Sequence, residues 1–174
     1  MIGERRQLAG YFLFLGFKRG AEIGVAKGDY SQILLDTIPD LELYLIDPWQ
    51  WWCEGYSDPE NAQQEEQDKR YEDVKQRFAG KNVVILRKTS MQAATILGDN
   101  FLDFVYIDAN HSYDWVMADM LVWWRKIRSG GILSGHDFDH QGVNEAVRDF
   151  ASNQKCEFNL ADNKIDWWIR KETE

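Results

Sequence analysis

The sequence predicts an α/β domain with a mostly parallel β-sheet and helices on both faces. Short apolar segments suited to buried strands alternate with segments whose apolar residues recur at helical spacing along most of the chain. Near the C-terminus, two apolar segments joined by Asp162-Asn163 predict a hairpin that adds an antiparallel strand. With 174 residues and 44% hydrophobic side chains, the chain suits a single domain, residues 1–174, with a substantial core.

Composition and charge narrow the classes of partner. The net charge of −9 argues against nucleic acid, because affinity for a phosphate backbone depends on Lys and Arg. No apolar run approaches the length of a membrane span, and the charged start does not resemble a signal peptide. Cys53 and Cys156 lack metal-ligand spacing and need not form a disulfide. We therefore expect a cytoplasmic protein that binds a small molecule and not a membrane.

The first two elements are expected to be a helix over residues 4–15, within an N-terminal segment 1–17, and a strand over 19–25. The helix is predicted because Leu8 and Phe12 fall on one face at helical spacing. We expect it to pack at the edge of the domain or to cover the site.

The first strand runs into Glu22-x-Gly24-x-x-x-Gly28, a pattern typical of a strand-to-helix turn. Apolar residues after Gly28 return at helical spacing and predict a helix over 29–38. Glycine permits positive φ and lets a ligand approach the backbone closely. Because ligands of open α/β sheets bind at the carboxyl ends of strands, this turn is a candidate ligand site.

Three classes of ligand compete for such a turn. A phosphate-binding P-loop needs Lys after its last glycine, but Asp29 follows Gly28. A dinucleotide fingerprint needs glycine where Glu22 stands. A ligand without a pyrophosphate meets no repulsion from Glu22, which can serve hydroxyls, an ammonium or a sulfonium; S-adenosylmethionine carries all three. The remaining alternative is a tight turn that binds nothing.

The second strand, expected over 41–46, ends in Asp47-Pro48-Trp49. An acidic residue at this place, roughly 20 residues after the glycine turn, holds ribose hydroxyls in comparable sheets. A carboxylate suits this role because it accepts hydrogen bonds from both hydroxyls. The alternative is a solvated carboxylate at the end of a strand.

Residues 48–80 are expected to form an insertion that could act as a lid. Its first part carries four aromatic residues, Trp49, Trp51, Trp52 and Tyr56. They could cover an adenine, form a wall for the substrate or pack under the next helix. That helix is expected over 61–79 and ends at Gly80.

The third strand, over 83–86, precedes Ser90, which we expect to cap a helix over 91–97. A contact between Ser90 and a cofactor is an additional interpretation. The fourth strand, over 101–107, is apolar on both faces, as a central parallel strand should be, and it ends at Asp108.

A helix over 113–127 follows, with Met117, Leu121 and Trp124 as its apolar stripe, which Trp123 broadens. The remaining elements are expected over 132–134, 156–160 and 165–169 as strands and over 143–152 as a helix. Polar clusters follow the first five strands, at 22–28, 47, 90, 108–113 and 135–140. Because successive parallel strands end at one edge of the sheet, these clusters should converge there.

In this pattern the chain resembles a class I S-adenosylmethionine-dependent methyltransferase, and most of all the small bacterial methyltransferase family 24. The matching stretches are Ala21–Gly28 with Ser31, Leu45–Trp49, Val105–Tyr113 and Gly130–Asp137. The resemblance covers most of the chain from residue 18 to residue 150. It implies a Rossmann-like, seven-stranded sheet whose final strand is reversed, in agreement with the terminal hairpin.

The resemblance implies S-adenosylmethionine as the cofactor. Residues Glu22 to Gly28 would surround its methionine part, Asp47 would bind its ribose, and Ser90 would lie near its adenine. The full set of implied cofactor-binding residues is Glu22, Gly24, Val25, Gly28, Ser31, Asp47, Pro48, Trp49, Ser90 and Asp108.

The expected reaction is transfer of the methyl group to a hydroxyl of a small molecule, such as a sugar or a secondary metabolite. His111 is the candidate general base, because imidazole titrates near neutral pH, and Asp108 or Asp137 could orient it. The alternative is a structural role for His111 at the start of the following helix.

Related enzymes that use magnesium supply an Asp after the fourth strand and an Asp-Asp or Asp-Asn pair after the fifth. Asp108 and Asp137 match the first two positions, but Phe138 stands at the third. Asp139 or His136 could substitute, although magnesium prefers oxygen ligands.

Two further functional classes remain open. A module that keeps the cofactor fold without turnover would use the aromatics of residues 49–56 as a partner surface. An NAD-dependent oxidoreductase is disfavoured by Glu22 at the first glycine position. Because the core sheet leaves little chain for an acceptor-binding cap, two alternatives stay open: a small acceptor, or a pocket that a second subunit of a homo-oligomer completes.

Overall fold

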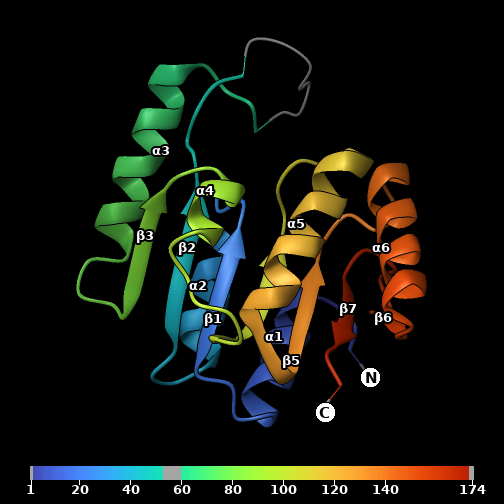
Figure 1. The fold of residues 1–174 in the computed structure, drawn as a ribbon. Helices are drawn as coiled ribbons and strands as arrows, with labels where there is room; N and C mark the ends of the chain where they lie inside the picture. Colours follow the sequence, from blue (N-terminus) through green and yellow to red (C-terminus); the bar gives the residue numbers. More distant parts are fainter. Residues whose placement is uncertain (1, 53–59, 173–174) are drawn as a thin grey trace.

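The computed structural model describes residues 2–52 and 60–172. Seven strands form one sheet in the order β3-β2-β1-β4-β5-β7-β6 (Figure 1). The strands are β1 (Arg19–Ile23), β2 (Glu42–Asp47), β3 (Val83–Arg87), β4 (Leu102–Ile107), β5 (Ile127–Gly135), β6 (Phe158–Leu160) and β7 (Trp167–Arg170). The helices are α1 (Arg5–Phe14), α2 (Asp29–Thr37), α3 (Gln64–Arg77), α4 (Ser90–Ala94), α5 (Tyr113–Lys126) and α6 (Gln141–Gln154).

The pairing of the strands confirms the predicted fold class. Strands β1 to β5 pair in parallel, whereas β7 runs antiparallel to both β5 and β6. The C-terminal hairpin therefore inserts its second strand next to β5 and leaves β6 at the edge. This is a Rossmann-like sheet with a reversed final strand.

Each face of the sheet has its own hydrophobic core. In β4, Val105 and Ile107 pack with residues of α4, α5 and α6, whereas Phe104 and Tyr106 pack with residues of α1, α2 and α3. Successive side chains of a strand point to opposite faces, so a central strand covered by helices on both sides must be apolar throughout. Within the described ranges, no helix is long and apolar enough to cross a membrane.

The start of β5 differs from the prediction. The strand begins at Ile127, directly after α5, so it is longer than the predicted strand over 132–134 and includes Gly130-Gly131. The register between β4 and β5 shifts between Leu102 and Phe104. A Cβ on Gly131 would lie 2.5 Å from the carbonyl oxygen of Asp103, so glycine is needed where the two strands approach at this irregularity.

The buried face of α5 differs in part from the prediction: Trp123 is buried as expected, but the face is not centred on Leu121. The buried residues are Val116, Asp119, Met120 and Trp123, whereas Leu121 is 51% exposed. The helix carries its own apolar and aromatic side chains on every side, so two different stripes have the spacing of a buried helical face. The choice between them places Asp119 inside the protein, which matters for the site below.

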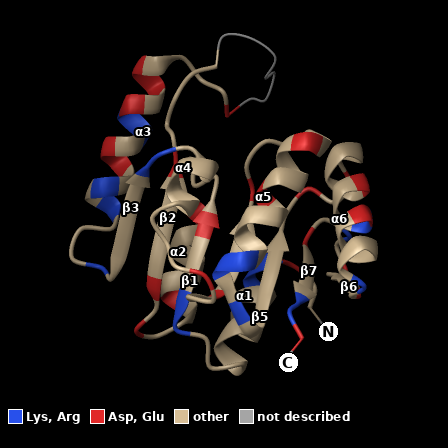
Figure 2. Cartoon of the chain, in the orientation of Figure 1, with Lys and Arg blue, Asp and Glu red and all other residues tan. Residues whose placement is uncertain are grey.

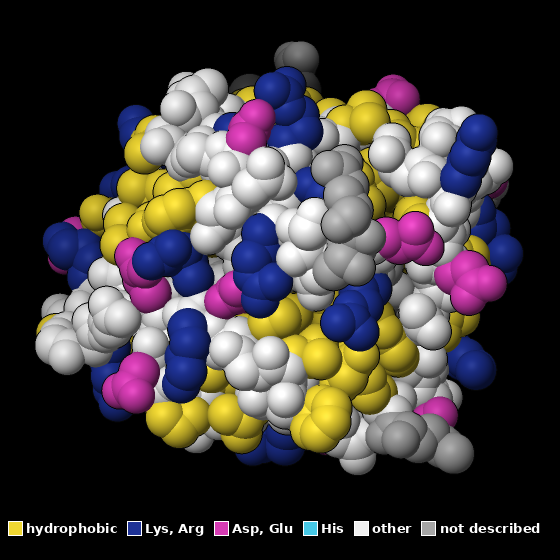
Figure 3. All heavy atoms as spheres, turned by 60° about the horizontal axis from the view of Figure 1, so that its bottom comes forward, with side chains coloured by type: hydrophobic (Ala, Val, Ile, Leu, Met, Phe, Trp, Pro, Cys, Tyr) yellow, Lys and Arg dark blue, Asp and Glu magenta, His cyan; other side chains and the backbone are white. Residues whose placement is uncertain are grey.

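The surface carries mixed charge and scattered hydrophobic groups. Figure 2 shows acidic and basic residues interleaved along α3, where Lys69 pairs with Asp73 and Lys75 with Glu72. Hydrophobic side chains reach the surface in groups between charged ones on the face that Figure 3 presents. In α1, Phe14 is 83% exposed.

Candidate active site

Two neighbouring cavities lie at the carboxyl ends of the central strands. Their volumes are about 240 and about 230 Å³, and Glu60 and Ala109 line both, so we treat them as two halves of one cleft. Seven of the ten predicted cofactor-binding residues line the cleft: Asp47, Pro48 and Ser90 in the first cavity, and Glu22, Gly24, Val25 and Asp108 in the second. Gly28, Ser31 and Trp49 line neither cavity.

The two glycines of the first turn are required by contacts within the protein. Gly24 has φ +88°, and a Cβ there would lie 2.0 Å from the carbonyl oxygen of Asp108. Gly28 has φ +78°, and its Cβ would lie 2.7 Å from the ring of Phe78. The predicted positive φ is confirmed at both glycines, and contacts within the protein give each a further reason to lack a side chain. Gly24 also lines the second cavity, so close approach of a ligand there stays a prediction.

Asp47 ties the loop after β1 to the loop after β2. Its Oδ2 accepts hydrogen bonds from the backbone N–H groups of Val25 (3.0 Å) and Ala26 (2.9 Å), and its Oδ1 accepts one from Trp49 (2.6 Å). Burial raises the pKa of Asp47, and these three bonds oppose that rise. Because a carboxylate oxygen accepts more than one bond, Oδ1 keeps capacity for a hydroxyl in the first cavity.

Trp49 supports the loop and does not face the cleft. The residue has φ +41°, and its side chain is fully buried. Its Nε1 donates to the carbonyl oxygen of Ala26 at 2.9 Å, and its ring packs against Tyr71. Of the alternatives for this aromatic segment, packing under the next helix is confirmed for Trp49, whose ring is not placed to contact a cofactor. Tyr56, another aromatic of this insertion, lies outside the described residues.

Glu22 and Ser31 form a buried pair beneath the second cavity. The Ser31 hydroxyl donates to Oε2 of Glu22 at 2.5 Å, and both residues are almost completely buried. Burial raises the pKa of Glu22 to about 8, although the bond from Ser31 opposes this. Ser31 therefore acts on Glu22 and does not reach the cavity itself.

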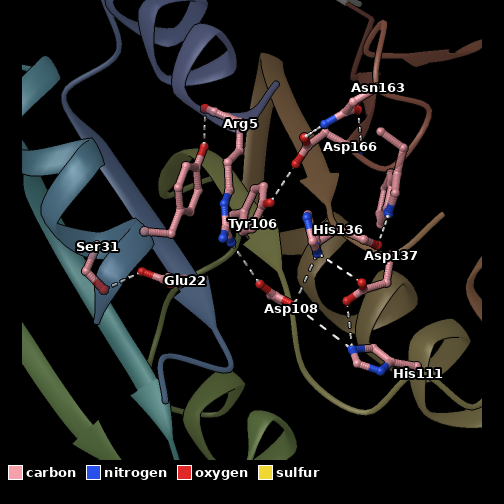
Figure 4. Close-up of polar contacts among 12 residues, drawn as sticks. Arg5, Glu22, Ser31, Tyr106, Asp108, His111, His136, Asp137, Asn163 and Asp166 are labelled. Carbon is pink, nitrogen blue, oxygen red and sulfur yellow. Dashed lines mark hydrogen bonds and ion pairs between the residues drawn. The ribbon is translucent and has the colours of Figure 1, made fainter. Parts of the chain in front are cut away.

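Two carboxylates and two histidines meet after β4 and β5 (Figure 4). Nε2 of His111 lies 3.0 Å from Oδ2 of Asp137, and Nδ1 of His136 lies 3.0 Å from Oδ1 of the same residue. Asp108 is farther from both rings, at 4.0 Å. Of the two carboxylates expected to orient His111, Asp137 is thus the one in contact, and His111 itself lines the second cavity.

Burial and mutual contacts shift the pKa values of the groups in this cluster. Burial raises the pKa of Asp108 to about 6. Partial burial also acts to raise the pKa of Asp137, but contacts with His111 and His136 outweigh it and hold that pKa well below its ordinary range. For His136, burial acts to lower the pKa, and the hydrogen bond to Asp137 raises it overall. Asp137 therefore ionises more readily than an ordinary aspartate, between two imidazole rings.

The donor set does not fit magnesium. Among the described residues, the group that could hold an ion is Asp108, His111 and Asp137, whose ligand atoms lie within 4.8 Å of one another. Asp139 is exposed and outside this group, so its predicted role as a ligand is corrected. Phe138, which takes the position of the third oxygen ligand, is buried. Magnesium requires near-octahedral oxygen ligands, and here an imidazole would stand among them.

Several residues that line the cleft were not predicted from the sequence, and Arg5 and Asp119 are the two that matter most for its chemistry. Arg5 of α1 reaches the second cavity, where its Nη1 lies 3.6 Å from Oδ2 of Asp108 (Figure 4). Asp119 of α5 lines the first cavity and accepts a hydrogen bond from Ser90. No sequence pattern indicated Arg5. Asp119 would have stood out as a carboxylate within an apolar stripe if the correct face of α5 had been chosen.

The role of Ser90 also needs correction. The N-cap of α4 is Thr89, whose side chain accepts from the backbone N–H of Gln92 while the Gln92 side chain accepts from the backbone N–H of Thr89. This is a capping box, and it leaves Ser90 in the first turn of the helix. The hydroxyl of Ser90 is then available to side chains of α5.

The order of the sheet, the glycine turn and the cleft at the strand ends together define a Rossmann-like domain of the methyltransferase class. A family profile described as "Methyltransferase domain" (Methyltransf_24) matches residues 21–138, and the chain belongs to this family. This family favours methyl transfer over the NAD-dependent alternative. No curated protein matches the sequence.

Solved structures share the fold at low sequence identity. The O-methyltransferase NovP is 13% identical, with a TM-score of 0.70 over 97% of this chain and 78% of its own. An O-methyltransferase from Bacillus cereus in complex with SAH is 14% identical, with a TM-score of 0.66 over 95% and 78%. TomG, an O-methyltransferase from Streptomyces achromogenes involved in tomaymycin synthesis and solved with SAM, is 17% identical, with a TM-score of 0.65 over 98% and 79%.

Proposed function

We propose that the protein transfers a methyl group from S-adenosylmethionine to a hydroxyl of a small molecule, with His111 as general base. The observation that carries the proposal is the position of the His111–Asp137 pair. His111 lines the second cavity, and Asp137 lies 3.0 Å behind it. An imidazole supported by a carboxylate beside a ligand cleft is suited to accept a proton from an acceptor hydroxyl.

The cleft suits the parts of this cofactor. The first cavity combines apolar walls, from Pro48, Trp52 and Trp115, with the carboxylates of Asp47 and Asp119, which suits an adenosine. The second cavity brings the carboxyl groups of Glu22 and Asp108 together with the guanidinium of Arg5, which suits the ammonium and the carboxylate of the methionine part. In this arrangement Asp47 binds the ribose, as the sequence predicts.

The chain's own residues then need to perform few steps. Bound S-adenosylmethionine supplies an electrophilic methyl group on its sulfonium. His111 removes the proton of the acceptor hydroxyl, and the anionic Asp137 stabilises the imidazolium that forms. Asp137 also fixes the orientation of the ring through its contact with Nε2. Magnesium has no part in this proposal, because the donor set does not fit it.

The acceptor is the least constrained component. TomG is involved in tomaymycin synthesis, and by extension we propose a hydroxyl of a secondary metabolite or a sugar as the acceptor here.

Methyl transfer from radiolabelled S-adenosylmethionine to a panel of phenols, sugars and hydroxylated heterocycles tests the proposal. We expect transfer to at least one acceptor by the wild-type protein. His111→Gln should reduce that rate at least about 10²-fold, because this is the usual contribution of a positioned base. Its affinity for S-adenosylhomocysteine should stay within about twofold, because the cofactor does not need the base.

The controls separate the alternatives. Transfer that survives in His111→Gln would remove His111 as the base. A loss of affinity as large as the loss of rate would show that His111 is structural. Binding of S-adenosylhomocysteine without transfer to any acceptor of the panel would support the alternative of a cofactor-binding module without turnover.

A further inference from the structure

Asp119 is a buried carboxylate that the methyl-transfer chemistry does not use. It lies on α5 beside Val116, Met120 and Trp123, and it is 3% exposed. Burying a carboxylate is costly unless hydrogen-bond donors compensate for the lost water. The side chain nevertheless lines the first cavity, next to Ala109. Asp119 is therefore placed to accept a hydrogen bond from a ligand in the first cavity.

The donor and the acceptor of each hydrogen bond around Asp119 can be assigned in only one way. An indole nitrogen can only donate, and Nε1 of Trp123 donates to the Ser90 hydroxyl at 2.8 Å. The single proton of that hydroxyl is then directed to Oδ1 of Asp119. Ser90 consequently has no proton left for a ligand, and Oδ1 of Asp119 already has its donor.

The second oxygen of Asp119 remains available to a ligand. Among the described residues, Ser90 is the one side chain that donates to this carboxylate. Burial raises the pKa of Asp119 and the hydrogen bond from Ser90 opposes that rise, with a net pKa of about 6. The carboxyl group is therefore mostly ionised at neutral pH. An ionised, buried oxygen at the edge of a cavity can accept a hydrogen bond from an N–H or O–H group of a ligand.

We propose that Asp119 selects adenine in the cofactor by accepting a hydrogen bond from its exocyclic amine. This inference rests on the proposed function. The walls around Asp119 suit a planar base, because Pro48, Ala109, Trp52 and Trp115 line the same cavity. A base with a carbonyl in place of the amine, such as hypoxanthine, would place one acceptor against another. Sites built to bind an N–H group reject analogues that lack it, because a buried polar group is left unpaired.

Calorimetric titration with S-adenosylhomocysteine and with S-inosylhomocysteine tests this role. For the wild-type protein we expect the adenosine compound to bind about 10²-fold more tightly. In Asp119→Asn, the side-chain amide can donate to the carbonyl of hypoxanthine, so the ratio should fall below about fivefold. Asp114→Asn, on the exposed part of the same helix, removes the same charge and should keep the wild-type ratio.

The outcomes distinguish this inference from the function on which it rests. A wild-type ratio near one, or an unchanged ratio in Asp119→Asn, would overturn the role of Asp119 while tight binding of S-adenosylhomocysteine still supported the proposed function. Absence of S-adenosylhomocysteine binding to the wild-type protein would overturn the proposed function and this inference together. Thermal unfolding of each variant shows whether it is folded, and the wild-type ratio tests the inference even if Asp119→Asn is not.

Discussion

Oδ2 of Asp137 lies 3.0 Å from Nε2 of His111, although the two residues follow different strands. The sheet explains this contact. Strands β4 and β5 pair in parallel with Ile107 opposite Gly135, so the residues that follow them emerge side by side. The left-handed backbone of Asp137, with φ +55°, belongs to the turn that carries this carboxylate. The parallel pairing of β4 and β5 therefore brings His111 and Asp137 together, and the proposed chemistry depends on this pair.

The first prediction concerns Asp137 itself. Asp137→Asn should lower the rate of methyl transfer at least about 10²-fold, because a neutral amide cannot stabilise an imidazolium. The affinity for S-adenosylhomocysteine should change little, since Asp137 does not line the cleft. Single-turnover rates and calorimetry measure the two effects. Asp139→Asn is the matched control, because Asp139 is exposed, and a similar loss there would contradict the assignment.

The second prediction concerns Asp47. Asp47→Ala should weaken S-adenosylhomocysteine binding at least about tenfold, because a charged hydrogen-bond partner typically contributes ~1.5–3 kcal/mol. It should also lower the free energy of unfolding, because three backbone N–H groups lose their acceptor. Calorimetry and denaturant unfolding measure these effects. Glu42→Gln, near the other end of β2, changes a partly exposed ion pair and should alter stability by less than about 1 kcal/mol. Unchanged affinity in Asp47→Ala would remove Asp47 from the site.

The third prediction concerns the pH dependence of stability. The pKa of Glu22 rises from an ordinary value of 4.5 to about 8 in the folded protein, so between these values the folded state binds more protons than the unfolded state. Glu22 therefore makes stability fall as pH rises through this window. Glu22→Gln carries no titrating proton, so its stability relative to the wild-type protein should increase from pH 5 to pH 8, by about 2–4 °C in Tm for each kcal/mol. Melting curves whose separation does not change with pH would contradict the raised pKa.

The fourth prediction separates two reasons why a position requires glycine: a positive φ, and the lack of space for a Cβ. Gly24 and Gly80 both have positive φ, but only at Gly24 would a Cβ meet backbone atoms, whereas nothing lies within 4 Å of one at Gly80. Gly80→Ala should cost about 1 kcal/mol of unfolding free energy from backbone strain alone. Gly24→Ala should cost about 3 kcal/mol or more, because the loop and the end of β4 must separate. Equal costs in denaturant unfolding would show that the contact with Asp108 is not limiting.

The parts of the site that could be predicted follow from periodicity and chain order. Asp47, Asp108 and Asp137 each come directly at or after a recognisable strand, and parallel strands bring such positions to one edge of the sheet. The convergence needed no knowledge of side-chain packing. The sheet and its terminal hairpin could be predicted in the same way, because the alternation of strands and helices is strong in this sequence.

The parts that could not be predicted depend on packing. Trp49 follows a strand as Asp47 does, but its ring turns inward to fill space beside Tyr71. Apolar residues occur on every side of α5, so helical spacing did not identify its buried face, and the stripe chosen from the sequence left out Asp119. Arg5 reaches Asp108 across 103 positions of sequence, and only the packing of α1 brings them together.

Calorimetric titration of the wild-type protein with S-adenosylhomocysteine tests the central claim, that the cleft binds this cofactor, most directly. The account predicts one site with a Kd on the order of micromolar, unchanged by EDTA, and no binding of NAD under the same conditions. Failure to bind S-adenosylhomocysteine, or binding of NAD with equal affinity, would contradict it.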